Sequence, residues 1–238
     1  MKILVISDLH LFDSRNEEVM EEKRLAELAG FINCSGIDAV LNLGDTVSRP
    51  PFLRETIPSM EKGFEHYLKW REQFSIPFAE CAITRELGFF SEIMGQSPDS
   101  VTDLASDTTV ITMTPREGVG HNFTRQQLDF LKDALECRKG KTIVIGTHVP
   151  FPGSCSREEK PGIFLEFPPD FREYLYSFPG KIIWCGGHFH WDQETPAKTG
   201  SLTALYASRF KLQVRGDFTY TSVIDTESGD ITFDFHDF

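Results

Sequence analysis

The chain of 238 residues is long enough to bury a sizeable core, and we expect one α/β domain over residues 1–238. Hydrophobic residues make up 40% of the sequence and charged residues 25%, a composition that suggests neither an intrinsically disordered chain nor a membrane-inserted one. The formal net charge of −12 disfavours nucleic-acid binding, but it does not exclude a phosphate substrate because bound divalent ions reverse the charge locally.

Neither the N-terminus nor the cysteines indicate export or membrane insertion. The apolar run from Ile3 to Ile6 is too short for a signal peptide or a spanning helix, and Asp8 follows it closely. The five cysteines are odd in number and form no Cys-x-x-Cys pair, which disfavours a disulfide framework and a thiolate zinc site. We therefore expect no membrane association and a cytoplasmic location.

Short apolar runs alternate with amphipathic stretches through most of the chain. The runs predict strands over residues 3–7, 39–43, 75–83, 109–113, 142–147 and 181–185. Hydrophobic residues at helical spacing predict helices over residues 17–33 and 56–74, and a capping box from Thr124 to Gln127 predicts the start of another. This alternation is typical of βαβ units and a largely parallel sheet.

The pattern changes from about Ser201 onward. Residues 202–207, 218–224 and 231–235 are predicted strands, separated by turn signals, and we expect them to form antiparallel pairs in a second sheet region. The segment 151–169, rich in Pro, Gly and charged residues, predicts a long surface loop.

Polar residues follow four of the predicted strands at the point where each strand ends. They are Asp8 and His10, Asp45, His148, and the pair His188 and His190. Ligands of open α/β sheets bind beyond the carboxyl ends of the strands, so we expect these side chains to converge at one edge. In an extended chain, residues i and i+2 point to the same side, and the glycines before three of these residues allow sharp turns.

The side chains in this group offer only carboxylate oxygen and imidazole nitrogen. These ligands suit Mn, Fe, Zn, Co or Ni, and they disfavour Ca or Mg sites built from oxygen alone. The sequence therefore predicts a transition-metal site.

In order along the chain, Asp-x-His, Gly-Asp, a lone His after a strand and Gly-His-x-His resemble the motifs of the calcineurin-like metallophosphoesterases, over about residues 1–191. The resemblance implies an α/β fold with a central β-sandwich flanked by helices, and two divalent metal ions that share Asp45. It implies that the first ion is held by Asp8, His10, Asp45 and His190, and the second by Asp45, His148 and His188.

One motif of that family, Gly-Asn-His followed by Asp or Glu, is altered in this sequence. The expected place reads Ile83-Thr84-Arg85-Glu86. Thr84 would replace the Asn that binds the second ion, and since a hydroxyl is a poorer ligand than an amide oxygen, we expect weak binding there. Arg85 would replace the His that assists the leaving group. With a pKa above ~12 it cannot act as an acid, but it can bind phosphate oxygens and stabilise developing charge. Glu86 would supply a carboxylate if the loop were shifted.

Other histidines and the phenylalanines fit structural positions better than the site. His66 falls in the middle of a predicted helix and His121 in a loop. Most of the 21 phenylalanines mark the core, although Phe12, Phe151 and Phe189 are candidates for the wall of the site.

Two functions fit this set of residues. The first is a hydrolase of small phosphomonoesters or phosphodiesters, in which a hydroxide that bridges the two ions attacks phosphorus in line. The second, motivated by Thr84 and Arg85, is a metal-binding fold with degraded catalysis that acts as a binding or regulatory module. A nuclease is disfavoured because the chain is acidic and has no Lys/Arg stripe.

Overall fold

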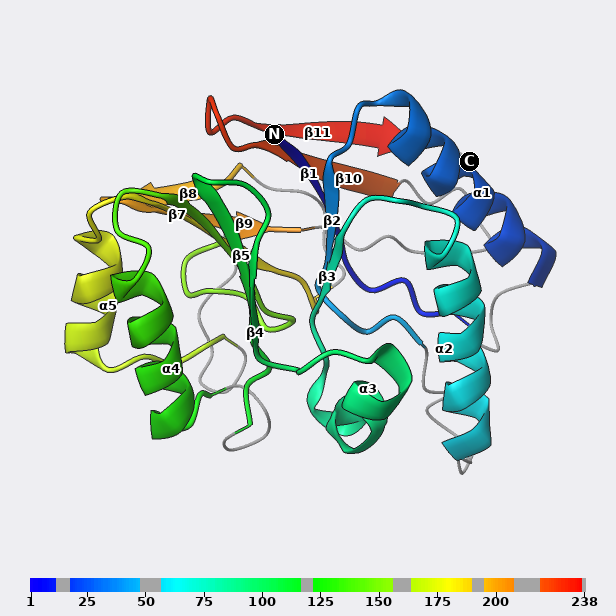
Figure 1. The fold of residues 1–238 in the computed structure, drawn as a ribbon, viewed down its shortest axis with the longest axis horizontal. Coiled ribbons are helices and arrows are strands. Elements are labelled where there is room, and N and C mark those ends of the chain that lie inside the picture. Colours follow the sequence, from blue (N-terminus) through cyan, green and yellow to red (C-terminus); the bar gives the residue numbers. More distant parts are fainter. Residues whose placement is uncertain are drawn as a thin grey trace.

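The computed structural model describes residues 1–11, 18–47, 57–116, 122–155, 164–189, 195–207 and 219–236. These residues form two β-sheets that face each other, with helices on the outer side of each (Figure 1). The prediction of an α/β fold with a central β-sandwich flanked by helices is confirmed.

The first sheet has the strand order β11-β10-β1-β2-β3. Its parallel part comprises β1 (Lys2–Ile6), β2 (Ala39–Asn42) and β3 (Phe78–Glu80). The antiparallel strands β10 (Thr219–Asp225) and β11 (Ile231–His236) extend it beyond β1. Its helices are α1 (Glu18–Cys34), α2 (Ile57–Arg71) and α3 (Leu87–Met94), and the short 3-10 helix η1 (Thr84–Glu86) precedes α3.

The second sheet has the strand order β4-β5-β6-β7-β9-β8. Its centre is parallel and comprises β5 (Thr108–Thr112), β6 (Thr142–Gly146), β7 (Lys181–Gly186) and β9 (Leu202–Tyr206). The edge strands β4 (Ser100–Asp103) and β8 (Ala197–Thr199) are antiparallel to their neighbours. Its helices are α4 (Arg125–Glu136) and α5 (Pro169–Tyr176). The predicted capping box is present at the start of α4, where the Thr124 hydroxyl accepts the Gln127 backbone N–H.

The central strands are buried on both faces, which is why they are continuous apolar runs in the sequence. Along β1, Ile3 and Val5 pack into a cluster shared by the two sheets, whereas Leu4 and Ile6 pack against the helices. A third cluster lies between the second sheet and its helices. The layers are therefore helix, sheet, sheet and helix.

The partners of the C-terminal strands differ from the prediction. β10 and β11 do form an antiparallel pair, but they join the first sheet through β1. β9 belongs instead to the second sheet and runs parallel to β7. The expectation that all these strands pair antiparallel in one region was therefore wrong, because neighbours distant in sequence select the partner of each strand.

Several elements were missed or mis-sized by the sequence patterns. The strand predicted over residues 75–83 is limited to β3, and α3, β4, α5 and β8 were not predicted. The predicted loop over 151–169 has no helix or strand in its described parts before α5 begins at Pro169, and residues 156–163 lie outside the described residues. No described helix has the length and apolar character needed to cross a membrane.

Candidate metal centre

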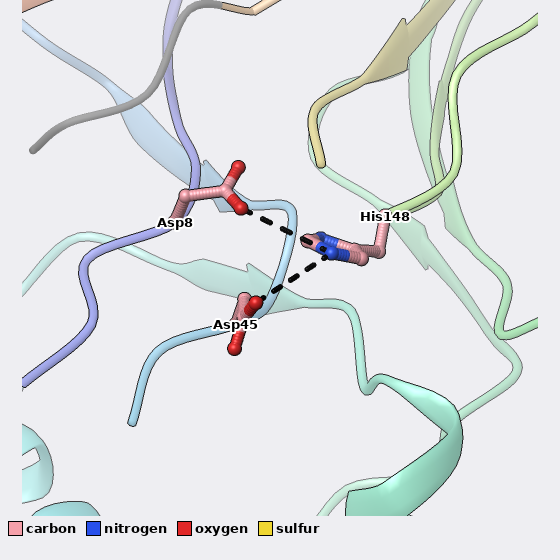
Figure 2. A group of neighbouring side chains, drawn as sticks. All are labelled: Asp8, Asp45 and His148. Atoms are coloured by element: carbon pink, nitrogen blue, oxygen red, sulfur yellow. Dashed lines mark ion pairs between the residues drawn. The ribbon is translucent and has the colours of Figure 1, made fainter. Parts of the chain in front are cut away.

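The polar residues after β1, β2, β6 and β7 come together where the carboxyl ends of the two sheets meet. Figure 2 shows Asp8, Asp45 and His148 converging from three separate segments of chain. One potential ligand atom from each of these residues lies within 4.8 Å of the others, and all three residues are buried. Asp8 and Asp45 come from the first sheet and His148 from the second.

The imidazole nitrogens face the same two carboxylate oxygens. His148 Nε2 lies 4.0 Å from Asp8 Oδ1 and 3.9 Å from Asp45 Oδ2. His10 Nε2 lies 3.7 Å from each of these oxygens. Ligand–metal bonds of about 2.0–2.2 Å place the ligands of one ion roughly 3–4 Å apart, so this spacing suits atoms that share a cation.

The position of His148 is fixed by a hydrogen bond between the two sheets. Its Nδ1 lies 3.1 Å from the backbone oxygen of Leu43, which can only accept, so Nδ1 carries the proton. The Nε2 atom then offers a lone pair, and it lies 3.1 Å from Nδ1 of His188. A carbonyl that fixes the ring and its tautomer in this way is the usual support of a histidine that binds a metal ion.

Asp8 is oriented by two donors on one of its oxygens. Its Oδ2 accepts hydrogen bonds from the Ser7 hydroxyl and from the backbone N–H of His188, the latter at 3.0 Å. The other oxygen, Oδ1, faces the two imidazoles. A Cβ atom at Gly187 would lie 2.0 Å from Ser7 Oγ, so only glycine allows the His188 segment to approach this closely.

The backbone around the site is unusual. Among the described residues, the non-glycine residues with positive φ are Asp8 (56°), His10 (49°), Asp45 (52°) and His188 (80°). This left-handed conformation is disfavoured for residues with a Cβ, and such strain concentrates at functional sites. The prediction of an extended chain from Asp8 to His10 was therefore wrong, although both side chains still reach the site and Leu9 is buried.

Of the glycines expected to turn the chain before Asp45, His148 and His188, Gly44 has a positive φ, at 92°. A Cβ atom there would lie 2.9 Å from the backbone oxygen of Cys81 and 3.2 Å from the side chain of Ile83. The segment that carries Asp45 therefore packs directly against the segment that follows β3.

That following segment is the altered motif. Thr84 is exposed, and its hydroxyl donates to the backbone oxygen of Pro115 at 3.4 Å. Glu86 is buried, and its Oε2 accepts the backbone N–H of Ile83 at 3.0 Å, so it caps η1. Arg85 lies in η1, but its side chain is outside the described part of the structure.

The remaining candidates divide into three groups. His190, His121 and Phe12 lie outside the described residues. Phe151 is buried in the core beside Trp184, with ring centroids 5.2 Å apart, so its predicted place in the wall of the site was wrong. Phe189 is half-buried, and its ring centroid lies 5.2 Å from that of His188.

The donor set fits a divalent transition metal. Two buried carboxylates and the imidazole nitrogens of His10 and His148 point to one region, where without a cation the carboxylates would repel each other. Ligands of this kind suit Mn, Fe, Zn, Co and Ni. Asp8, His10, Asp45, His148 and His188 are the residues available to hold such ions among those that the structure describes.

The sequence matches no protein-family model and no curated protein. The fold, in contrast, is similar to solved structures. A dimetal phosphatase from Danio rerio superposes with a TM-score of 0.71 at 11% identity, covering 93% of this chain and 92% of that one. TT1561 of Thermus thermophilus gives 0.59 at 10% identity, over 98% and 97% of the two chains. GAP50, described as the anchor in the inner membrane complex of Plasmodium, gives 0.53 at 10% identity, over 100% and 88%.

Proposed function

We propose that this chain, which has the fold of the calcineurin-like metallophosphoesterases, hydrolyses small phosphomonoesters or phosphodiesters with divalent metal ions. The observation that carries the proposal is the convergence of Asp8, Asp45 and His148 at the carboxyl ends of three strands from two sheets. The dimetal phosphatase from Danio rerio has the same fold, which supports this proposal.

The ligands would be shared between two metal ions as the sequence motifs suggest. Asp8, His10 and Asp45, with His190, would hold one ion, and Asp45, His148 and His188 would hold a second. Bound divalent ions would neutralise charge on the phosphoryl oxygens and activate water as the nucleophile.

The chain's own groups set the electrostatics around that centre. The hydrogen bond to Leu43 keeps His148 in the tautomer that leaves Nε2 free to bind a cation. The two donors on Asp8 Oδ2 fix its carboxylate so that Oδ1 faces the centre. Such prearranged ligands need little reorganisation when phosphoryl charge develops.

The altered motif gives the proposed reaction its selectivity. Arg85 would stabilise charge on the phosphoryl group, but it supplies no proton to the leaving group. We therefore expect activated aryl esters, which leave without protonation, to react faster than alkyl esters.

A substrate screen with controlled metal content tests the proposal. The metal-free protein is assayed on p-nitrophenyl phosphate and bis(p-nitrophenyl) phosphate after addition of Mn²⁺, Fe²⁺, Zn²⁺, Co²⁺ or Ni²⁺. We expect metal-dependent turnover. Asp45→Asn should lower it by at least ~10²-fold, since losing a negatively charged ligand weakens binding of both ions. The control Asp133→Asn removes an exposed carboxylate on α4 and should leave turnover unchanged. Metal-loaded protein that hydrolyses neither ester would contradict the proposal.

One observation favours a second function, a metal-binding module with degraded catalysis. Thr84 is exposed and its hydroxyl faces Pro115, although the corresponding family residue is an Asn that binds metal. GAP50, which shares the fold, is described as an anchor. Metal binding without turnover in the screen would favour this function.

A further inference from the structure

Asn42 contacts the chain on both sides of Asp45. Its side-chain oxygen accepts the backbone N–H of Gly44 at 3.1 Å. Its side-chain nitrogen donates to the hydroxyl of Thr46 at 2.9 Å. A single amide group therefore holds the residues immediately before and after the carboxylate.

The orientation of this amide is set from deeper in the fold. The Asn42 nitrogen also donates to the Tyr67 hydroxyl at 3.0 Å, which uses the second of its two protons. The Tyr67 hydroxyl in turn donates to the Glu80 carboxylate at 2.9 and 3.0 Å. Arg71 Nη1 lies 3.3 Å from Glu80 Oε1 and closes the chain of contacts. With each donor matched to an acceptor, the amide has one orientation.

This network occupies a place where apolar residues would be expected. Asn42, Tyr67 and Glu80 are at most 1% exposed, and Tyr67 belongs to the apolar cluster beneath the helices of the first sheet. Burial raises the pKa of the Glu80 carboxyl, with Arg71 opposing the shift, and burial also raises the pKa of the Tyr67 hydroxyl. Buried polar groups cost stability that apolar residues of the same shape would avoid, whereas a fully hydrogen-bonded buried network makes its surroundings rigid and specifies one arrangement.

The turn that carries Asp45 is a geometry that needs such support. Gly44 and Asp45 both have positive φ, and Asp45 must keep Oδ2 between His10 and His148. Residues held in the left-handed region persist only where their surroundings over-determine them. The contacts of Asn42 with Gly44 and Thr46 provide that constraint.

We propose that Asn42 is a positioning residue for the Asp45 carboxylate, with Thr46 as its partner and with Tyr67 and Glu80 as its anchor. The inference rests on the proposed function because it assumes that Asp45 binds a metal ion. It assigns the buried Tyr67–Glu80 pair to the metal centre, although neither side chain is placed among the metal ligands.

The test measures metal affinity directly, by calorimetric titration of the metal-free protein with Mn²⁺. Thr46→Val keeps the side-chain shape and removes the acceptor for Asn42, and Tyr67→Phe removes the hydroxyl that anchors the amide. Each should weaken Mn²⁺ binding by about 10-fold or more, the usual effect of losing a group that supports a ligand. Thr46→Ser keeps the hydroxyl. Its Mn²⁺ affinity should stay within about threefold of the parent's, a much smaller change than the loss expected for the other two variants.

Thr108→Val is the matched control. It also removes a buried threonine hydroxyl, but from the first residue of β5, where the hydroxyl donates to Thr226. It should lower the unfolding temperature without changing Mn²⁺ affinity. Thermal unfolding of every variant separates loss of fold from loss of Mn²⁺ affinity. The test changes only the partners of Asn42, so it does not depend on whether an Asn42→Ala variant folds.

The outcomes separate the two proposals. If the parent binds Mn²⁺ and both Thr46→Val and Tyr67→Phe bind it equally well, the positioning role is overturned and the network serves stability alone. If the parent shows no saturable Mn²⁺ binding, the proposed function fails, and the positioning role fails with it.

Discussion

The two halves of the candidate site are built differently. The segments after β1, β2, β6 and β7 are tied to one another by hydrogen bonds, and two of these bonds, His148–Leu43 and His188–Asp8, join the two sheets. The segment after β3 contacts its surroundings differently: Thr84 is exposed, and Glu86 caps its own turn. The first half has the features of a rigid metal centre, whereas the second carries the residues that depart from the family pattern.

The two halves therefore differ in how firmly hydrogen bonds hold their side chains. Asp8 and His148 are each fixed by a bond to the opposite sheet, so moving one strand end would disturb ligands from both. Nothing of this kind ties the described atoms of Thr84 to the ligands. We therefore expect changes after β3 to affect catalysis more than metal binding.

The largest effect is expected at Asp45, whose Oδ2 lies near both His10 and His148. Asp45→Asn should reduce the metal content of purified protein far more than His148→Ala does, because it removes a negative charge shared by both ions. Elemental analysis of the two variants, purified side by side, gives the comparison. An equal loss of metal in both variants would argue against a shared role for Asp45.

Arg85 should govern turnover without governing metal content. Arg85→Ala should lower kcat/KM by roughly 10-fold or more, since it removes a charged hydrogen-bond donor to the phosphoryl group. Arg85→His should raise turnover of alkyl phosphates by up to about 10²-fold by supplying an acid, with less effect on aryl phosphates. Unchanged kinetics in Arg85→Ala would place the side chain away from the substrate.

Gly187 tests how tightly the metal-binding half is packed. Gly187→Ala should destabilise the metal-free protein by about 1–3 kcal/mol, because the added Cβ would overlap Ser7 Oγ and lie 2.8 Å from Asp8 Oδ2. Gly30→Ala, in α1 with nothing within 4 Å of the added Cβ, is the control and should stabilise the protein by about 0.5–1 kcal/mol. Urea unfolding measures both, and similar values for the two variants would contradict close packing at Gly187.

The smallest effect is expected for Thr84→Asn. An amide oxygen is a better metal ligand than a hydroxyl, so occupancy of the second ion should rise by a few-fold at limiting metal, while the first ion is unaffected. Metal titration of this variant beside Thr84→Val, which lacks any ligand atom, provides the measurement. Identical titrations of the two variants would show that Thr84 does not reach the metal centre.

Sequence patterns correctly located the strands whose positions are set by burial alone. Central strands such as β1 and β6 are buried on both faces, so their apolar runs ended within one residue of the observed strand ends and located Asp8 and His148. Partner choice failed for β10 because it pairs with β1, at the other end of the chain. Local patterns contain no information about such pairings.

The support of the ligands could not be predicted from the sequence for the same reason. Ser7 and Asn42 stand close in sequence to Asp8 and Asp45, and that proximity was the only available signal. The role of Asn42 depends on its contact with Tyr67, which only the folded chain brings close to it. The reasoning that paired Asp8 with His10 assumed an extended chain, whereas both residues have positive φ.

The central claim is that the ends of four strands hold divalent metal ions. It is tested most directly by equilibrium titration of the metal-free protein with Mn²⁺, following the electron paramagnetic resonance signal of free Mn²⁺. For the parent chain we predict saturable binding of two ions of unequal affinity, and loss of both in the Asp8→Asn/Asp45→Asn double variant. A parent that binds no Mn²⁺ saturably, or a double variant that binds it as the parent does, would contradict the claim.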